Sequence, residues 1–580
     1  MSRSSTSSTN RSKESDGAIP SQDGTDTKTD DTDDTVSSTA SAGVQMMQAT
    51  TLVWSTKILV AAYAVVWFIY FINNIQQGVA SVLTNFLVGK FGKHSSLPAV
   101  GLMSSLVGGL TKLPLAKVLD IWGRPQGFLF CVAILTLGLV LMAFCDNFET
   151  YATAQVFYWV GYGGVAYTLH VFIADTSSLE NRALAIAYSN SPYIITAWIG
   201  GPLADWVLAG PGIAWAFDLF AIIIPAITIP LSSLFMLNYR KIKDEYLLTE
   251  EKSGRTTWQS IKHYFEHFDV IGLLLVITGF ALFLIPFTLW PTERQGFGSP
   301  MIIAMMTIGI SILIAFAVWE MFYTDIGFIP WKLLADRTTL GACLLGASLY
   351  ISFSMCYSYL FPFLIVVNGL DIKKASYISQ IYGVGSSLWS IVVGAAIRKS
   401  GRFRWLAWYF GMPVTILGVG LMIHFQRPDV SIGYVIMCQV LTSFAGGTVF
   451  LCEQTAASST VPHEHIAVVM ALESSFCGLG GAIGSAIATA VWQAIFPAKL
   501  QSYLPPADLG HLDEIVGSMN RQTTYPMGSP TRTAIIQAYG EAQTTMIIIS
   551  TAVLCLSVAF VALWRDIDVK AVKQTKGNVV

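Results

Sequence analysis

Long apolar stretches, each bounded by charged residues, glycine or proline, recur along the chain from Thr56 to Leu563. A bilayer core about 30 Å thick is crossed by roughly 20 apolar residues in a helix, and the stretches have about that length. The pattern predicts an all-α membrane protein with fourteen spanning helices. The predicted spans lie near residues 55–76, 96–117, 126–145, 152–174, 183–207, 213–236, 268–290, 300–322, 339–366, 373–397, 403–424, 431–454, 465–496 and 542–563.

The composition agrees with this pattern. The 580 residues are 53% hydrophobic and only 12% charged, whereas a soluble globular protein has about 25% charged residues. Residues 1–50 differ, because their Ser, Thr and Asp content is too polar to bury a core, and they predict a disordered tail. No soluble segment contains a nucleophile–base pair or metal-ligand spacing, so we expect neither an enzyme nor a resident cofactor or metal.

The distribution of basic residues predicts the orientation of the helices. An even number of spans puts both termini on one side of the membrane. Basic residues are concentrated in the connecting segments on that side, for example at Arg240, Lys241 and Lys243. The positive-inside rule assigns that side to the cytosol. The longest segment on the outer side then lies between the last two spans, at residues 497–541.

The turns that follow spans 2 and 10 resemble each other. They read AKVLDIWGRP (116–125) and GAAIRKSGRF (394–403), each with a Gly-Arg pair in a tight turn. Two unrelated basic loops are one explanation, but the offset of eight spans favours an internal repeat of six-helix halves around two inserted helices. The predicted divisions are a cytosolic tail (1–50), a first half (51–237), a cytosolic loop (238–267), the inserted helices with an inner linker (268–337), a second half (338–564) and a cytosolic tail (565–580).

This layout resembles the major facilitator superfamily, whose loop signature is roughly G-x-x-x-D-[RK]-x-G-[RK]-[RK]. The first turn fits at Asp120, Gly123 and Arg124, while in the second turn Arg398 stands where an acid is usual. The resemblance implies alternating access by rocking of two halves, with these turns as cytosolic latches. The residues expected to form the gate and latches are Asp120, Gly123, Arg124, Arg182, Arg398 and Arg402.

Two longer stretches carry a more specific resemblance. They read ADTSSLENRALAIAYSNSPYIITAWIGGPLAD (174–205) and TVPHEHIAVVMALESSFCGLGGAIGSAIATAVW (460–492), and they are similar to the fungal siderophore-iron transporter family, in particular its Mir group. The resemblance covers every predicted span. It implies proton-coupled uptake of a ferric hydroxamate siderophore, with a triacetylfusarinine type favoured, across the fungal plasma membrane or an endosomal membrane. The chain is then a monomer in the bilayer with no nucleic-acid partner.

Two other functions stay open from the residues alone. A drug or toxin:proton antiporter also has fourteen spans, but its helix 5 pattern survives here only as Gly201-Pro202. A receptor that signals through its tails would need a folded cytosolic domain, and the predicted tails are short for one.

Ionisable residues inside the spans are costly to bury, so each is a functional candidate. Lys112 and Glu473 lie about 12 Å along their helices from the nearest predicted interface. These residues form either a proton relay or a structural ion pair at a hydrated cavity wall. The candidates for proton coupling are Glu473, Glu453, Lys112, His170 and Asp175.

Polar aromatic side chains in the middle of spans need a hydrogen-bond partner that lipid cannot supply. They predict a central substrate cavity, although core packing explains some of them equally well. Amides at the outer end of span 1 would form its mouth. The candidate substrate-binding residues are Asn73, Asn74, Gln77, Tyr158, Tyr162, Asn190, Tyr193, Trp198, Tyr357, Tyr359, Tyr382 and Trp389.

Two further features have alternative interpretations. The outer segment 497–541 is either a solvated linker or a lid that captures cargo through Tyr503, His511, Tyr525 and Tyr539. His463-Glu464-His465 has metal-ligand residue types, but in a helix the two histidines point about 200° apart. This triplet therefore predicts a helix start and an inner-gate contact instead of a metal site.

Overall fold

The computed structural model describes residues 54–90, 97–245, 256–293, 295–324, 329–572, 574 and 579. The predicted tail at residues 1–50 and part of the predicted loop at 238–267 lie outside these residues. Within the described residues the secondary structure is helical throughout, and no strand is present. The prediction of an all-α fold is confirmed.

Thirteen helical segments of the described residues are long and apolar enough to cross a membrane. They agree with the predicted spans apart from 183–207. In chain order they are α2 (Thr56–Lys90), α3 (Leu97–Leu110) with α4 (Lys112–Trp122), α5 (Arg124–Ala143), α6 (Phe148–Thr176), α10 (Ile213–Glu245), α12 (Val270–Leu284) with α13 (Pro286–Leu289), α14 (Pro300–Phe322), α16 (Arg337–Tyr357) with α17 (Leu360–Val366), α18 (Ile372–Ser400), α19 (Arg404–Leu406) with α20 (Met412–Phe425), α21 (Ile432–Ser459), α22 (Ile466–Tyr503) and α25 (Pro530–Ala562).

The predicted span 183–207 is present but broken. It consists of α7 (Leu179–Asn190), α8 (Tyr193–Thr196) and α9 (Gly200–Ala209). Pro192 cannot donate a backbone hydrogen bond at the first break. At the second break the chain passes so close to α2 that a Cβ atom added to Gly200 would lie 3.1 Å from the Cα atom of Gly78. An unbroken helix was therefore the wrong expectation for this segment.

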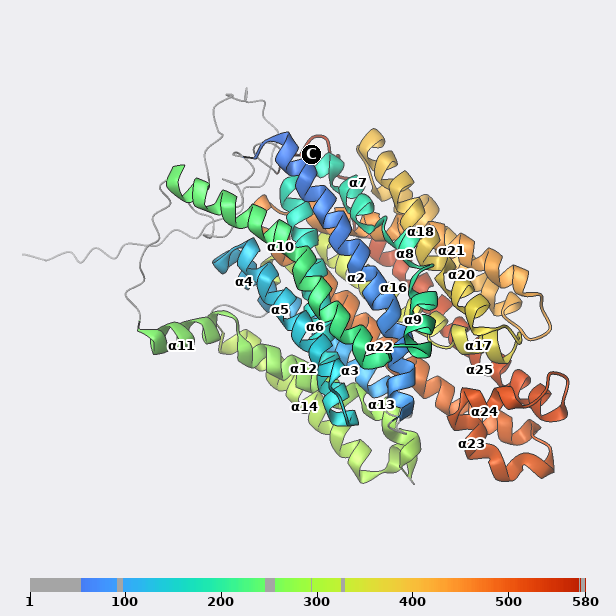
Figure 1. The fold of residues 1–580 in the computed structure, drawn as a ribbon. Helices are drawn as coiled ribbons and strands as arrows, with labels where there is room; N and C mark the ends of the chain where they lie inside the picture. Colours follow the sequence, from blue (N-terminus) through green and yellow to red (C-terminus); the bar gives the residue numbers. More distant parts are fainter. Residues whose placement is uncertain are drawn as a thin grey trace, which may run out of the picture. The chain divides into compact units, whose positions relative to one another are not determined.

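The spanning helices form two packed groups. In the first group α5 packs on α6 and α10, and α2 packs on α9 and α10; in the second group α16 packs on α22 and α25, and α18 packs on α21. Figure 1 shows the blue-to-green helices of the first group beside the yellow-to-red helices of the second. The groups meet where α22 contacts α3 and α4, and where α18 contacts α7 and α8.

Two glycines form the crossing between α3 and α22. A Cβ atom added to Gly109 would lie 2.9 Å from the Cα atom of Gly478, and one added to Gly478 would lie 2.7 Å from that of Gly109. The Ser475 hydroxyl donates to the Gly109 carbonyl over 3.1 Å. The helix backbones therefore touch directly, as small residues permit in membrane helices.

The helices α12 and α14 pair with each other, and α12 and α13 also contact α3 and α22. Asp269 caps α12 in a left-handed conformation, with φ of 44°. Its carboxylate accepts hydrogen bonds from the Gly272 amide and the Trp319 indole, each at 3.0 Å. This residue fixes one end of the pair.

The segment between α22 and α25 is folded. It contains the 3₁₀ helix Pro506–His511, α23 (Leu512–Gly517) and α24 (Met519–Thr524), which we call the cap (Figure 1). The buried Arg532 guanidinium donates to the Val366 carbonyl over 3.1 Å and to the Gln522 carbonyl. The cap is thus fastened to the end of α17 and is not an extended linker.

Candidate functional site

A large cavity lies between the two groups of helices. The space inside it that water molecules could occupy is about 430 Å³, which is within the range of about 300–1,000 Å³ for pockets that bind drug-sized ligands. Side chains of α2, α6, α7 and α8 line it from the first group, and side chains of α16, α18, α20, α21 and α25 line it from the second. A bulky ligand in this cavity would contact both groups at once.

Half of the predicted substrate-binding residues line this cavity. They come from both groups of helices, and two of the predicted proton-coupling residues, His170 and Glu453, join them. The substrate-binding candidates on the cavity wall are Asn74, Tyr162, Asn190, Tyr193, Tyr357 and Tyr382.

The aromatic side chains of the cavity wall contact each other across helices. The ring centroids of Tyr357 and Tyr382 are 5.2 Å apart, and Phe353 stacks on Tyr357 at 4.6 Å. The Tyr193 hydroxyl donates to the Gln380 side-chain oxygen over 2.6 Å, which joins α8 to α18. The wall therefore offers aromatic faces and hydroxyl groups, without any Lys or Arg among its residues.

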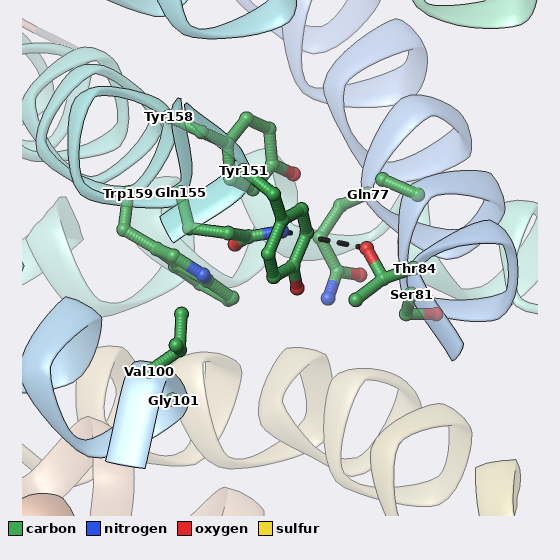
Figure 2. Close-up of a pocket in the computed structure, with 10 residues that line it drawn as sticks. Gln77, Ser81, Thr84, Val100, Gly101, Tyr151, Gln155, Tyr158 and Trp159 are labelled. Carbon is green, nitrogen blue, oxygen red and sulfur yellow. Dashed lines mark hydrogen bonds between the residues drawn. The ribbon is translucent and has the colours of Figure 1, made fainter. Parts of the chain in front are cut away.

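Two predicted residues line a separate, smaller pocket. Gln77 and Tyr158 belong to a hollow of about 190 Å³ between α2, α3 and α6. Figure 2 shows the α6 side chains reaching toward those of α2, with Val100 and Gly101 below them. We call this hollow the side pocket.

The other four candidates lie elsewhere. Asn73 is buried within the first group. Tyr359 stacks on Trp492 with 4.2 Å between ring centroids. Trp389 donates to the Thr448 hydroxyl over 3.1 Å. Trp198 is 41% exposed at the break before α9. The contacts of Tyr359 and Trp389 are those of residues that pack between helices, which was the alternative to substrate binding.

Several cavity residues were not among the candidates. They include hydroxyl side chains of α18 and α21 and aromatic side chains of α2 and α16. Ser386, Ser387 and Ser390 recur on one face of an apolar span, and this spacing is a signal that could have identified them. The main unpredicted lining residues are Tyr70, Tyr350, Phe353, Ser386, Ser387, Ser390 and Thr442.

Two carboxylates lie close together at the cavity wall, which Glu453 lines, with Glu473 behind it. Glu453 of α21 and Glu473 of α22 are 3% and 2% exposed. Their oxygens and the Cys477 sulfur all lie within 4.8 Å of one another. Gln454 donates to Glu473 over 2.8 Å, and the Cys477 thiol donates over 3.1 Å. Among the described residues no ion pair links either carboxylate to a Lys or Arg.

The remaining proton-coupling candidates surround this pair or lie at the latch. Lys112 of α4 interacts electrostatically with Glu473. His170 lines the cavity, and its ring lies 5.8 Å from that of Tyr70. Asp175 is instead part of the first latch. The five candidates thus do not form one continuous chain of contacts.

The first latch is a buried ion network. Arg124 pairs with Asp120 at 2.6 Å and with Asp175 at 3.0 Å, and Gly123 before it has a φ of 101°. The His463 imidazole of the second group lies 3.7 Å from the other Asp175 oxygen. The turn predicted from the signature therefore connects, through Asp175, to the second group.

Arg182 joins the C-terminal segment to this end of the molecule. Its guanidinium donates to the Ala174 carbonyl over 3.1 Å and to the Gln574 side-chain oxygen over 2.9 Å. The Gln574 amide donates in turn to the carbonyls of Ser458 and Val461, at 2.9 and 2.7 Å. Gln574 is a bridge between the two groups that no sequence pattern indicated.

The second Gly-Arg turn has different partners. Gly401 ends α18 with a φ of 73°, and its carbonyl accepts from the Val569 amide over 2.8 Å. Arg402 forms an exposed ion pair with Asp566 at 3.2 Å. Arg398 is exposed and has no ion pair within the described residues. The departure from the signature at Arg398 thus coincides with a turn held by the C-terminal segment.

His463-Glu464-His465 forms a short 3₁₀ helix directly before α22. His463 faces Asp175, whereas His465 lies 3.7 Å from its neighbour Glu464. The two imidazoles have separate partners, and the triplet forms the start of a helix where the two groups meet.

The four residues predicted for the lid are held by neighbouring side chains, and two of them lie on the helices that flank the cap. Tyr503 of α22 donates to Glu541 of α25, and Tyr539 of α25 donates to Gln522 of the cap over 3.0 Å. Tyr525 lies under the Arg521 guanidinium at 5.7 Å, and His511 lies 3.4 Å from Glu514. None of these residues lines the large cavity.

The chain is similar in sequence and in fold to known membrane proteins. The family model of the Major Facilitator Superfamily matches residues 66–327 and 321–485. An Ajellomyces capsulatus protein described as MFS siderochrome iron transporter 1 is 52% identical over 550 residues, which cover 95% of this chain and 94% of that protein. Siderophore iron transporter mirB of Emericella nidulans is 37% identical over 538 residues, or 93% and 89% of the two chains. The crystal structure of the human organic anion transporter MFSD10 (TETRAN) matches 85% of this chain and 98% of its own with a TM-score of 0.52 at 12% identity, which shows the fold alone.

Proposed function

Because this chain belongs to the major facilitator superfamily and, within it, to the siderochrome iron transporters, we propose that it carries a ferric hydroxamate siderophore across the fungal plasma membrane into the cytosol. Its family is one of transporters and not of enzymes. The observation that carries the proposal is the large cavity, whose wall of tyrosines and hydroxyl groups is built by both groups of helices.

The chemistry of the wall suits such a cargo. Iron(III) prefers hard oxygen ligands and is already enclosed by those of the siderophore, so the protein has no need to ligate it. A bulky complex of low charge is recognised by shape, aromatic contact and hydrogen bonds. Among hydroxamates, a triacetylfusarinine type remains the favoured cargo from the sequence resemblance.

Transport by alternating access would use the contacts at the Gly123 end as a gate. In the proposed orientation this end faces the cytosol, together with both termini. The Asp175 network and the Gln574 bridge would break when the cavity opens inward and form again when it opens outward. The chain would act as a monomer, because the cavity is complete within one copy.

Proton coupling would depend on the two buried carboxylates. Two carboxylates this close repel each other when both are ionised, so one shared proton is favoured. Glu453 lines the cavity and Glu473 lies behind it. A proton that arrives with the cargo would be the one that the pair shares, which would remove the repulsion and permit closure, and its release to the cytosol would restore the repulsion. Gln454 and Cys477 would orient Glu473 for this exchange.

The cap is the proposed lid. Its fastening through Arg532 keeps it at the end of α17, and its exposed polar and aromatic groups present a surface to the outer solution in the proposed orientation. Cargo would contact this surface before it enters the cavity.

Uptake measurements test the function. Cells that lack their own siderophore transporters would express the chain and receive a panel of radiolabelled ferric siderophores, with and without a protonophore. We expect saturable uptake of at least one trihydroxamate complex that the protonophore abolishes. No uptake of any complex would refute siderophore transport, and uptake that the protonophore leaves unchanged would refute proton coupling. Drug resistance without uptake would favour the antiporter.

A further inference from the structure

The side pocket has a composition that fits a ligand. Its lining contains no charged residue, and it combines amide and hydroxyl groups with aromatic rings. Gln155 and Tyr158 are 6% and 2% exposed, so their polar atoms are held in place within the first group. The space inside the pocket that water molecules could occupy is about 190 Å³, which is less than the roughly 300–1,000 Å³ of a pocket for a whole drug-sized ligand and suits one arm of a larger molecule.

Polar residues of α2 connect the side pocket to the large cavity. Asn74 lines the cavity, and Gln77, Ser81 and Thr84 line the side pocket. Their spacing of three and four residues puts them on one face of the helix. This face is polar from the cavity wall to the outer part of α2.

A second row of side chains runs along α6. Tyr158 and Trp159 line the side pocket, and Tyr162 lines the cavity. Tyr158 stacks on Tyr162 with 5.9 Å between ring centroids, and the Trp159 ring meets the Tyr162 ring edge-on at 5.8 Å. The aromatic surface is therefore continuous between the two spaces. Within the side pocket, Tyr158 and Trp159 lie across from Gln77 and Thr84 of α2 (Figure 2).

From this juxtaposition we propose that the side pocket is a second binding subsite, which holds part of the neutral ferric hydroxamate complex before the complex moves along α2 and α6 into the large cavity. The inference rests on the proposed function, because it takes the same cargo. The amides of Gln77 and Gln155 would bind carbonyl oxygens of the siderophore, and Trp159 would contact its apolar arms.

Gly101 allows the subsite to be filled without disturbing its walls. It lines the side pocket, and an added Cβ atom would meet no atom within 4 Å. Gly101→Ala and Gly101→Leu therefore occupy the pocket in two steps. Gly433→Leu is the matched control, because this exposed helical glycine of the second group has only the Ser431 hydroxyl oxygen, at 3.7 Å, near an added Cβ atom.

The test measures uptake of a radiolabelled ferric trihydroxamate by the full chain, with surface expression determined for each variant. We expect Gly101→Leu to raise KM about tenfold while the maximal rate stays within about twofold of the control, since capture weakens and reorientation does not change. The KM of Gly101→Ala should lie between those of the unmodified chain and Gly101→Leu. Gln155→Leu should also raise KM. An unchanged KM in Gly101→Leu and Gln155→Leu would overturn the subsite alone. Absence of uptake by the unmodified chain would overturn the proposed function together with it.

Discussion

Substitution of the buried residue Asp175 is the most direct test of the proposed gate. The Asp175 carboxylate accepts from Arg124 at 3.0 Å and faces His463 at 3.7 Å, so a single side chain connects the two groups of helices. Asp175→Asn keeps the volume of the side chain and removes its charge. We expect the closed form of this end to be destabilised relative to the open form.

The structure sets the size of this effect. Removing one partner of a buried ion pair costs about 3–5 kcal/mol when the other charge is left alone. The pair of Arg124 and Asp175 lies within the first group and is lost equally in the closed and open forms, so only the contact of Asp175 with His463, at 3.7 Å, changes the balance between them. This contact is long, and we expect it to contribute about 1.5 kcal/mol. Since about 1.4 kcal/mol corresponds to a factor of ten, the ratio of closed to open forms should fall about tenfold.

A reporter cysteine measures that ratio in purified protein. Seven of the eight native cysteines are buried and Cys555 is exposed, so the background would be Cys555→Ser. A cysteine at the buried Ser459 position lies beside Ser458, whose carbonyl Gln574 binds. We expect Asp175→Asn to accelerate its alkylation about tenfold.

Asp566→Asn is the control for this experiment. It removes an equivalent ion pair with Arg402, but both side chains are exposed, and such pairs contribute about 0–1 kcal/mol. Equal alkylation rates in Asp175→Asn and Asp566→Asn would refute the assignment of Asp175 to the gate.

Three further substitutions test other parts of the structure. Glu473→Gln should abolish protonophore-sensitive accumulation while surface expression is retained, because the amide cannot exchange a proton; normal accumulation would remove Glu473 from the coupling. Gly478→Ala should lower the free energy of unfolding by about 1–3 kcal/mol, because its methyl group would meet the Gly109 backbone at 2.7 Å. Gly481→Ala is the control and should have little effect, because its added Cβ atom would lie 3.8 Å from the Tyr350 ring. Thermal unfolding in detergent compares the two variants, and equal melting temperatures would contradict the close contact between Gly109 and Gly478. Arg532→Gln should release the cap and increase the rate of proteolysis between residues 504 and 529 at least several-fold. The reason is the loss of up to three hydrogen bonds to carbonyl groups, worth about 1.5–3 kcal/mol each. An unchanged cleavage rate would show that Arg532 does not fasten the cap.

Hydropathy predicted the spanning helices because the thickness of the bilayer fixes their length and their apolar character. The same measure is insensitive to the breaks around α8. Those breaks depend on Pro192 and on the approach of Gly200 to Gly78, and the approach is a contact between distant parts of the chain. A hydropathy value averaged over a window of residues detects neither the proline nor the close approach of the two glycines.

The candidate site was predicted only in part, for a geometric reason. Depth within a span can be read from the sequence, but the direction in which a side chain faces depends on how its helix is rotated against its neighbours. Tyr357 and Tyr359 are only two residues apart, yet the first lines the cavity and the second stacks on Trp492. The proximity of Glu453 to Glu473 likewise depends on the turn between α21 and α22.

The crossing of Gly109 and Gly478 has a consequence for the speed of transport. No side chain of either glycine interlocks there, so a tilt of α22 against α3 requires no change of rotamer at that point. The enthalpic barrier to reorientation would then arise at polar contacts between the groups, among them the contact of Asp175 with His463 and the hydrogen bonds of Gln574, Ser475 and Tyr193. The temperature dependence of turnover would therefore report on these polar contacts, and the apolar packing between the helices would contribute little to it.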